Sequence, residues 1–187
     1  KQEKKSYARK LVLPVSDQET NKIKALNALI KIYVASSKID SALKYAIQAQ
    51  KLSSTIKDEK FLSDSYSNLG VIYTNIGNYK KALEFHQEAL KNRQKFNNKS
   101  GIGYSYNNLA TVYNLLGNYE KALEMNLKSL KKREEIKDVK GQADSYVNIS
   151  VIYINLNQYE KALEYLSKAT NIYYRTGDNE KLALTFA

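Results

Sequence analysis

Residues 66–90 read YSNLGVIYTNIGNYKKALEFHQEAL, and this stretch decides the fold. Its apolar residues recur three or four positions apart in two runs, residues 66–76 and residues 79–90. That spacing is typical of amphipathic helices. Between the runs stand Gly77 and Asn78, which supply the left-handed backbone that ends a helix. The stretch therefore predicts two helices joined by a tight turn.

The same pattern returns forty residues later, and again after another forty. Residues 106–130 read YNNLATVYNLLGNYEKALEMNLKSL, and residues 146–170 read YVNISVIYINLNQYEKALEYLSKAT. A fainter copy precedes them over residues 26–49, and Phe186 starts a fifth copy that the chain cuts short. Self-similarity at a fixed period indicates a stack of structural repeats, each a pair of helices.

The repeats set the expected domain boundaries. We expect a solenoid of four forty-residue repeats over residues 16–179 and the start of a truncated fifth repeat over residues 180–187. Residues 1–15 form a basic amino-terminal segment, either a capping helix or a frayed tail, that Pro14 separates from the repeats. Residues 16–19 (SDQE) have the pattern of a capping box that opens the first repeat.

Short breakers are expected within every repeat. Ser37 is a weaker stop in the first copy, and the other breakers are Gly77-Asn78, Gly117-Asn118 and Asn157-Gln158. Small residues at Gly70, Ala110 and Ser150 are expected to let the paired helices approach closely.

The repeated columns resemble the tetratricopeptide repeat over residues 18–176. The residues that carry this resemblance in the second copy are Tyr66, Leu69, Gly70, Tyr73, Ala82, Phe85 and Ala89. The resemblance implies an all-α fold, a right-handed α-solenoid of stacked antiparallel helix pairs. The period here departs from the usual one of about 34 residues, and the Pro that commonly ends the second helix is missing.

The extra residues of each repeat fall in charged, helix-compatible stretches, residues 91–99, 131–140 and 171–179. They predict longer helices. The forty-residue form is similar to kinesin light chain, to Partner-of-Inscuteable-type scaffolds, and to sensor regions of certain bacterial histidine kinases.

Composition restricts the chemistry that the chain can carry. Its 187 residues are 43% hydrophobic, with 0 Cys and 1 His, which excludes disulfides, thiol chemistry and zinc sites of the Cys/His kind. The net charge is +11, and residues 1–60, with 13 basic and 6 acidic residues, contribute +7 of it. No window is apolar enough for a membrane helix. No cofactor or metal is implied, and the lack of Cys suits both cytosol and periplasm.

A solenoid of this kind binds extended partners along the concave surface that its first helices line. Asparagines recur on that side of the predicted first helices, away from the Tyr and Leu core positions. Because an amide offers a donor and an acceptor together, such an asparagine ladder can bond the main chain of an extended peptide. With neighbouring Lys and Thr residues, the candidate peptide-binding residues are Lys24, Asn27, Lys31, Asn68, Asn75, Asn107, Asn108, Thr111, Asn114, Asn148 and Asn155.

The asparagine ladder also has a purely structural interpretation. Buried polar groups need partners, so the amides can bond neighbouring backbone or each other between repeats and thereby hold the superhelix. Both roles can apply at once.

Positive charge at the amino-terminal end of this face favours an acidic or carboxylate-ended partner. The cluster comprises Lys24, Asn27 and Lys31. Asn27, Lys31 and Asn68 resemble part of the site with which co-chaperone tetratricopeptide domains hold a terminal carboxylate. Tyr104 and Asn108 replace the cations of the third repeat, so ordinary solvated lysines are the plainer interpretation.

His86 is the only histidine, in a second-helix column that holds Ala46, Asn126 and Leu166 in the other copies. No second His, Cys or convergent carboxylate pair accompanies it in the sequence pattern, so it is expected to be structural or exposed. We therefore predict no catalytic residue and no enzymatic activity.

Two further motifs are weak. Residues 101–103 (GIG) lack the strand and the Lys-Ser/Thr of a phosphate loop, and Gly101 aligns with Gly141 at the same turn between repeats. Basic residues between Lys128 and Arg133 are followed by two glutamates, which indicates a mixed helix surface. A nucleic-acid partner is not expected.

The sequence favours a non-catalytic protein–protein interaction scaffold that binds a peptide or protein segment in its concave groove. The alternative is a sensory input domain of a membrane signalling protein, because residues 17–46 and the forty-residue copies resemble the periplasmic repeat region of Bacteroidetes histidine kinases. That resemblance would imply a periplasmic location, and otherwise a cytoplasmic one. The identity of the partner and the oligomeric state stay open.

Overall fold

The computed structural model describes residues 17–185, and every regular element in that range is a helix. The helices are α2 (Asp17–Ala35), α3 (Ile39–Ile56), α4 (Glu59–Ile76), α5 (Tyr79–Lys95), α6 (Lys99–Leu115), α7 (Tyr119–Glu135), α8 (Val139–Asn155), α9 (Tyr159–Thr176) and α10 (Asn179–Leu184). The predicted amino-terminal segment 1–15, the first residue of the capping box and Phe186 lie outside the described residues.

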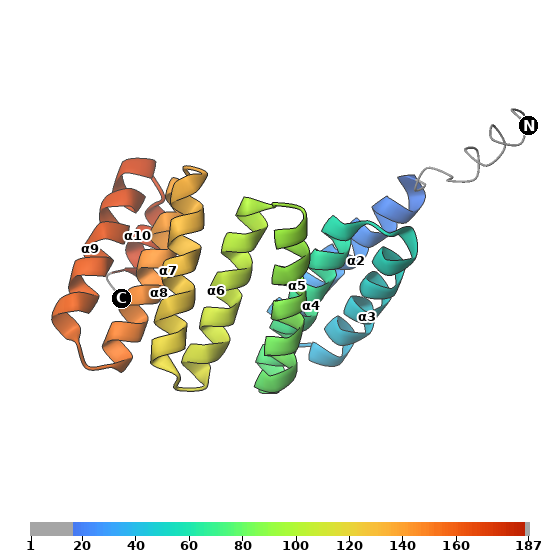
Figure 1. Cartoon of the computed structure of the whole chain (residues 1–187), viewed down its shortest axis with the longest axis horizontal. Helices are drawn as coiled ribbons and strands as arrows, with labels where there is room; N and C mark the ends of the chain where they lie inside the picture. The colour runs from blue at the N-terminus through green and yellow to red at the C-terminus, as the bar shows by residue number, and fades with distance from the viewer. Residues whose placement is uncertain (1–16, 186–187) are drawn as a thin grey trace, which may run out of the picture.

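The repeats follow one another in chain order along the long axis of the molecule, from α2 and α3 at one end to α8 and α9 at the other (Figure 1). The closest packing is between the two helices of one repeat, such as α6 with α7 and α8 with α9. The second helix of each repeat then packs against the first helix of the next, as α5 does against α6. This arrangement confirms the predicted all-α solenoid of stacked helix pairs.

One residue with left-handed backbone ends a helix every twenty residues. These residues are Ser37, Lys57, Gly77, Asn97, Gly117, Lys137, Asn157 and Gly177. The predicted breakers within the repeats are confirmed, including the weak stop at Ser37. In most junctions the side chain of the residue that follows caps the next helix, as Asn78 does by accepting a hydrogen bond from the backbone N–H of Lys81 at 3.2 Å. Lys38 and Gln158 make no such bond.

The charged stretches between repeats contribute only partly to helices. Helices α2 to α7 are each 17 to 19 residues long. However, α5 ends at Lys95 and α7 ends at Glu135, before the charged stretches end. The stretches therefore lengthen the second helices, as predicted. The turn to the next repeat follows, as residues 96–98 do after α5, and the last residue of each stretch already belongs to the next helix.

The core consists of aliphatic residues on facing sides of the paired helices, with stacked aromatic rings beside them. Ile23, Ile72 and Ile149 are fully buried. The rings of Tyr73 and Phe85 stack at 5.4 Å between centroids, as Tyr153 and Tyr165 do at 5.5 Å in the fourth repeat. These tyrosine rings therefore pack between the two helices of one repeat.

In the second repeat the His86 side chain fills the space that a side chain at position 70 would take. An added Cβ at Gly70 would lie 2.4 Å from the His86 ring, so the room left by the glycine is filled by the imidazole. The corresponding pairs in the other repeats are Ile30 with Ala46, Ala110 with Asn126, and Ser150 with Leu166. A larger residue on one helix is thus matched by a smaller one on the other.

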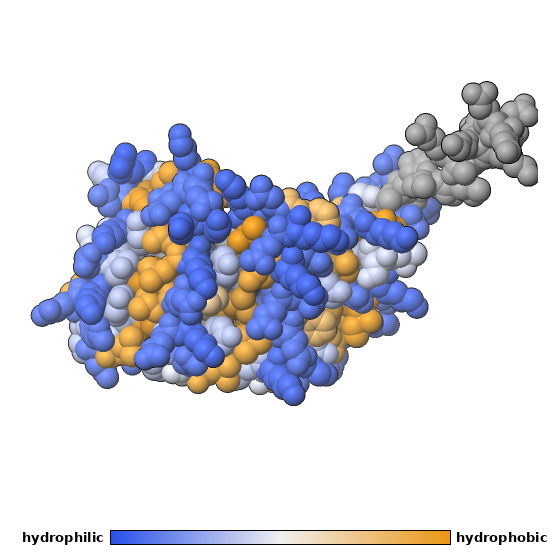
Figure 2. All heavy atoms as spheres, in the orientation of Figure 1, coloured by the Kyte–Doolittle hydropathy of each residue, from blue (hydrophilic) through white to orange (hydrophobic). Residues whose placement is uncertain are grey.

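The surface in Figure 2 carries its hydrophobic residues in narrow bands between hydrophilic ones, without one broad apolar patch. Within residues 17–185, the helices are all too short or too polar to cross a membrane.

Candidate functional site

The first helices of the repeats line the inner side of the solenoid. Helix α2 contacts α4, and α4 contacts α6, whereas no pair of successive second helices in residues 17–185 is in contact to the same extent. Because the first helices lie closer together than the second helices, the stack curves towards them. Their exposed side forms the surface that we call the inner groove.

Six asparagines of the predicted ladder bond one another across neighbouring repeats. In each case an amide nitrogen donates to an amide oxygen forty-one positions earlier: Asn68 to Asn27 at 2.9 Å, Asn148 to Asn107 at 2.5 Å, and Asn155 to Asn114 at 3.0 Å. These bonds give the ladder the structural role that the sequence left as an alternative. Each bond uses one nitrogen and one oxygen, so every amide keeps its other polar end.

The remaining candidate residues make fewer contacts. Lys24, Lys31 and Asn75 are exposed, and Asn108 is half-buried. None of these four makes a side-chain hydrogen bond or ion pair with another residue of the range 17–185. Thr111 is exposed and donates its hydroxyl to the backbone oxygen of Asn107 at 3.1 Å.

Apolar side chains are interleaved with these polar ones on the first helices. Val71, Leu115, Val151 and Ile154 are between 36% and 50% exposed, and Tyr104 is 53% exposed. The inner groove is therefore a mixed surface, able to cover aliphatic side chains and to bond a main chain.

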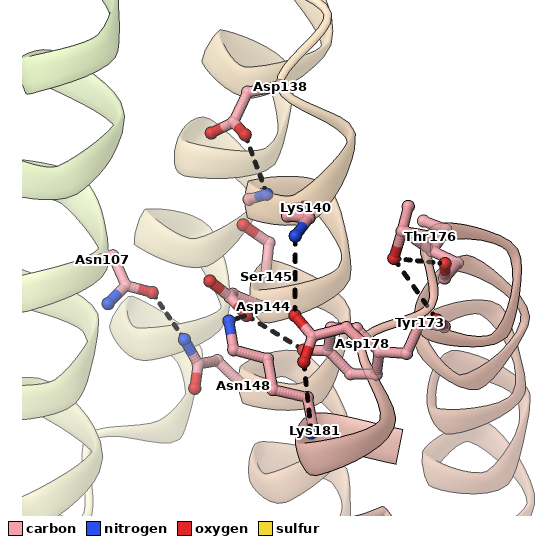
Figure 3. A network of polar contacts seen from close by, with 12 residues as sticks. Asn107, Asp138, Lys140, Asp144, Ser145, Asn148, Tyr173, Thr176, Asp178 and Lys181 are labelled. Atoms are coloured by element: carbon pink, nitrogen blue, oxygen red, sulfur yellow. Dashed lines mark hydrogen bonds and ion pairs between the residues drawn. The ribbon is translucent and has the colours of Figure 1, made fainter.

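The carboxy-terminal end of the inner groove is hollowed. A hollow of about 580 Å³ lies between α6, α8, α9 and α10, and Asn107, Asn148, Val151 and Ile154 are among its lining residues. Figure 3 shows two of these lining residues, Asn107 of α6 and Asn148 of α8, turned towards each other.

Asp144 joins three helices beside this hollow (Figure 3). Its Oδ1 accepts a hydrogen bond from the Tyr173 hydroxyl at 2.9 Å and another from Lys181 Nζ at 2.6 Å. Burial and the bond to Asp144 raise the pKa of Tyr173 above its ordinary value, so the phenol stays protonated as a donor. The carboxylate is thus balanced by Lys181 and adds no unpaired negative charge to the groove.

Two buried arginines were missed by the sequence analysis, which placed Arg133 on a mixed helix surface. That prediction is wrong, because Arg133 is 3% exposed and Arg93 is 7% exposed. Arg93 donates to Ser105 Oγ at 2.8 Å in the next repeat and pairs with Asp64 Oδ1 at 2.8 Å in its own. Arg133 likewise reaches the next repeat, where it donates a hydrogen bond to Ser145 Oγ at 3.2 Å.

The glycines of the weak phosphate-loop motif make room for these arginines. An added Cβ at Gly101 would lie 2.7 Å from Arg93 Cδ, and one at Gly141 would lie 2.9 Å from Arg133 Cδ. The spacing of eight residues between each arginine and its glycine is a signal that could have been found in the sequence. The GIG stretch is thereby explained by packing.

His86 is a packing residue in this structure. It is 1% exposed, and burial together with the nearby Arg93 lowers its pKa from 6.5 to about 4, so the imidazole is neutral near pH 7. No group of three or more His, Cys, Asp or Glu residues within the described range is arranged to hold a metal ion. Its Nδ1 has no hydrogen-bond partner among residues 17–185, and no carboxylate of that range pairs with the ring.

The chain was compared with curated proteins by sequence and with solved structures by fold. No curated protein matches the chain in sequence. Among solved structures, a Rap protein complexed with Competence and Sporulation Factor matches with a TM-score of 0.84 and 18% identity, over 91% of this chain and 47% of that one. Putative kinesin light chain TPR-like repeats from Podosopora anserina match with a TM-score of 0.68 and 17% identity, over 88% of this chain and 85% of that one.

A third similar structure is a Signal Transduction ATPase with Numerous Domains that has a tetratricopeptide repeat sensor, from Pyrococcus horikoshii. It matches with a TM-score of 0.77 and 22% identity, over 93% of this chain and 27% of that one. The chain thus spans less than half of the Rap protein and of the signal transduction ATPase. At these identities the similarity shows a shared fold.

The sequence pattern of the tetratricopeptide repeat matches residues 22–95 and 102–175, which together make up most of the chain. Members of this family are generally non-catalytic scaffolds for protein interaction. With four helix pairs stacked in the predicted order, the chain belongs to the tetratricopeptide repeat family.

Proposed function

We propose that this protein binds an extended segment of another protein in its inner groove and carries out no catalysis itself. The observation that carries the proposal is the unused half of each asparagine pair. The bond from Asn148 to Asn107 leaves the amide oxygen of Asn148 and the amide nitrogen of Asn107 available. In the other two pairs, too, the donor residue keeps its oxygen and the acceptor residue keeps its nitrogen. An extended main chain presents N–H and C=O groups in alternation, which such ends can bond.

The exposed aliphatic residues of the groove support the same function. Val71 and Val151 occupy equivalent positions in the second and fourth repeats, with Thr111 between them in the third. A bound segment can cover these side chains while its main chain meets the amides. Burial of apolar area then adds affinity of about 25 cal/mol per Å² before the costs of association.

The amino-terminal end of the groove favours negative charge on the partner. Lys24 and Lys31 are exposed on one side of α2 and pair with no carboxylate in residues 17–185. We propose that an acidic residue or a terminal carboxylate of the segment lies there.

Selection from a library of random twelve-residue peptides tests the proposal. The chain should enrich peptides that bind with measurable affinity. Replacing both Asn108 and Asn75 with Leu should weaken the affinity for these peptides about tenfold or more. Because these two amides bond no other side chain of residues 17–185, the replacement should not disturb the fold. The matched control is Gln87→Leu on the exposed side of the second helix α5, which should leave affinity unchanged. Equal affinity for both variants would contradict groove binding.

The alternative function is a sensory input domain within a larger signalling protein. The similarity of the fold to a protein with a tetratricopeptide repeat sensor favours it. In that case, peptide binding in the groove should change the activity of an adjoining catalytic domain in the complete gene product. A free adaptor would bind the same peptides without such an effect.

A further inference from the structure

A small hollow opens between α6, α7 and α8, next to the larger one at the carboxy-terminal end, with which it shares Asn148 and Val151 as lining residues. Its volume is about 110 Å³, roughly the share of three or four water molecules in the liquid. Its lining includes Ala110, Asn114 and Asn148 from first helices and Asn126 from the second helix α7. Asn126 therefore reaches the groove side from the layer behind it.

Asn126 has an unsatisfied polar atom. The residue is 2% exposed, and its Oδ1 has no hydrogen-bond partner among the described residues. An unpaired buried amide oxygen costs about 1–3 kcal/mol. In the first and fourth repeats the same position holds Ala46 and Leu166, which need no partner. At this position of the third repeat the amide oxygen is thus left without a donor among residues 17–185, and a water molecule or a group of a bound segment can supply one.

The ladder asparagines around the hollow add two more unused polar ends. Asn148 Nδ2 is bonded to Asn107, which leaves the Asn148 oxygen as an acceptor. Asn114 Oδ1 is bonded to Asn155, which leaves the Asn114 nitrogen as a donor. Neither end of the Asn126 amide is hydrogen-bonded within residues 17–185, so the lining offers the acceptor oxygens of Asn126 and Asn148 and the donor nitrogens of Asn114 and Asn126. The Thr111 hydroxyl, whose proton is donated to the backbone of Asn107, adds a further acceptor oxygen.

We infer that this hollow receives the carboxamide of an Asn or Gln side chain from the bound segment. A primary carboxamide has two N–H donors and one carbonyl acceptor, so it can donate to the oxygens of Asn126 and Asn148 and accept from one of the lining nitrogens at the same time. This inference rests on the proposed function, because it names one side chain of the segment in the groove.

Charged side chains fit the hollow poorly. No acidic or basic residue is among its lining residues, so a Lys or Arg side chain would be buried without a counter-charge. A carboxylate can accept from the nitrogens of Asn114 and Asn126, but it has no N–H to donate to the oxygens of Asn126 and Asn148. A neutral amide has neither cost.

The test uses peptides selected on the complete chain from the random library. One position of these peptides should be Asn or Gln, and changing Gln to Glu there should weaken binding about tenfold or more. The chain variant Asn126→Leu, which copies Leu166, should bind the Gln and Glu peptides within about threefold of each other. Asn126→Ala, which copies Ala46, serves if the Leu variant fails to fold by circular dichroism.

The outcomes separate the two proposals. Selected peptides with no preference for Asn or Gln, or a preference unchanged in Asn126→Leu, would overturn the carboxamide site and leave the hollow to water alone. Failure to select any peptide would instead overturn groove binding, and the carboxamide site with it.

Discussion

The side chain of Arg93 crosses the backbone of Gly101 at the junction between the second and third repeats. Arg93 is held there by Asp64 and Ser105, at 2.8 Å each. Because these bonds fix the guanidinium, the side chain cannot move aside without losing them. The junction therefore depends on the absence of a Cβ at Gly101.

Gly101→Ala should lower the free energy of unfolding by about 1–3 kcal/mol, because the new methyl group would lie 2.7 Å from Arg93 Cδ. Gly103→Ala is the matched control in the same helix. A Cβ there meets nothing closer than 3.5 Å, so the control should be neutral or stabilising by about 0.5–1 kcal/mol. Urea unfolding of both variants measures the difference, and equal stabilities would show that the crowding at Gly101 is not real.

Burial of neutral His86 makes stability depend on pH. Its folded pKa of about 4 lies below the ordinary value of 6.5, so the unfolded chain binds more protons between these values. Stability is therefore full above about pH 6.5, falls as the pH is lowered towards 4, and changes no further below it. Between pH 7.5 and 5 this contributes a loss of about 2 kcal/mol.

The variant His86→Asn, which copies Asn126, removes the titrating group. Urea unfolding of the original chain and the variant at both pH values isolates the contribution of His86, since the carboxylates are common to both. Parallel pH profiles would mean that His86 is accessible to protons in the folded chain.

Much of the fold follows from the sequence because the relevant signals are local. The helical spacing and the Gly and Asn breakers depend on near neighbours, and Gly77 and Gly117 adopt the expected left-handed backbone. Lys57 and Lys137 adopt it too, although nothing in a lysine side chain favours that conformation. There the tertiary packing of equal helices at a twenty-residue spacing imposes the turn.

The contacts of the candidate site were less predictable because they depend on partners in other repeats. The sequence places the asparagines on one side of the first helices but leaves open whether they bond each other or a ligand. The outcome differs from repeat to repeat. Asn148 has Asn107 as its partner forty-one positions earlier, whereas the residue forty-one positions before Asn108 is Ser67, and Asn108 makes no such bond in the described range.

Ser67→Asn should restore the missing rung of the ladder. The new side chain would stand opposite Asn108 as Asn107 stands opposite Asn148, forty-one positions away. The buried Ser67 Oγ has no partner in residues 17–185, so the substitution exchanges an unsatisfied group for a bonded one. We expect a gain of about 1 kcal/mol in urea unfolding. Ser67→Ala, which adds no acceptor, is the control, and a Ser67→Asn variant no more stable than that control would contradict the expected bond.

Asp144→Asn should loosen α10. That helix has six residues, and so short a helix is marginal by itself, which makes its tethers decisive. The bond from Lys181 Nζ to Asp144 Oδ1 is one such tether, and its charge assistance is lost in the amide. Because both side chains are more than a third exposed, the loss should be below about 1 kcal/mol, enough to speed amide hydrogen exchange in residues 179–184 several-fold.

The control variant is Glu124→Gln, which removes a negative charge from the ion pair with Lys128 on α7 and should leave this exchange unchanged. Unchanged exchange in both variants would show that α10 is held by its apolar contacts with α9 alone.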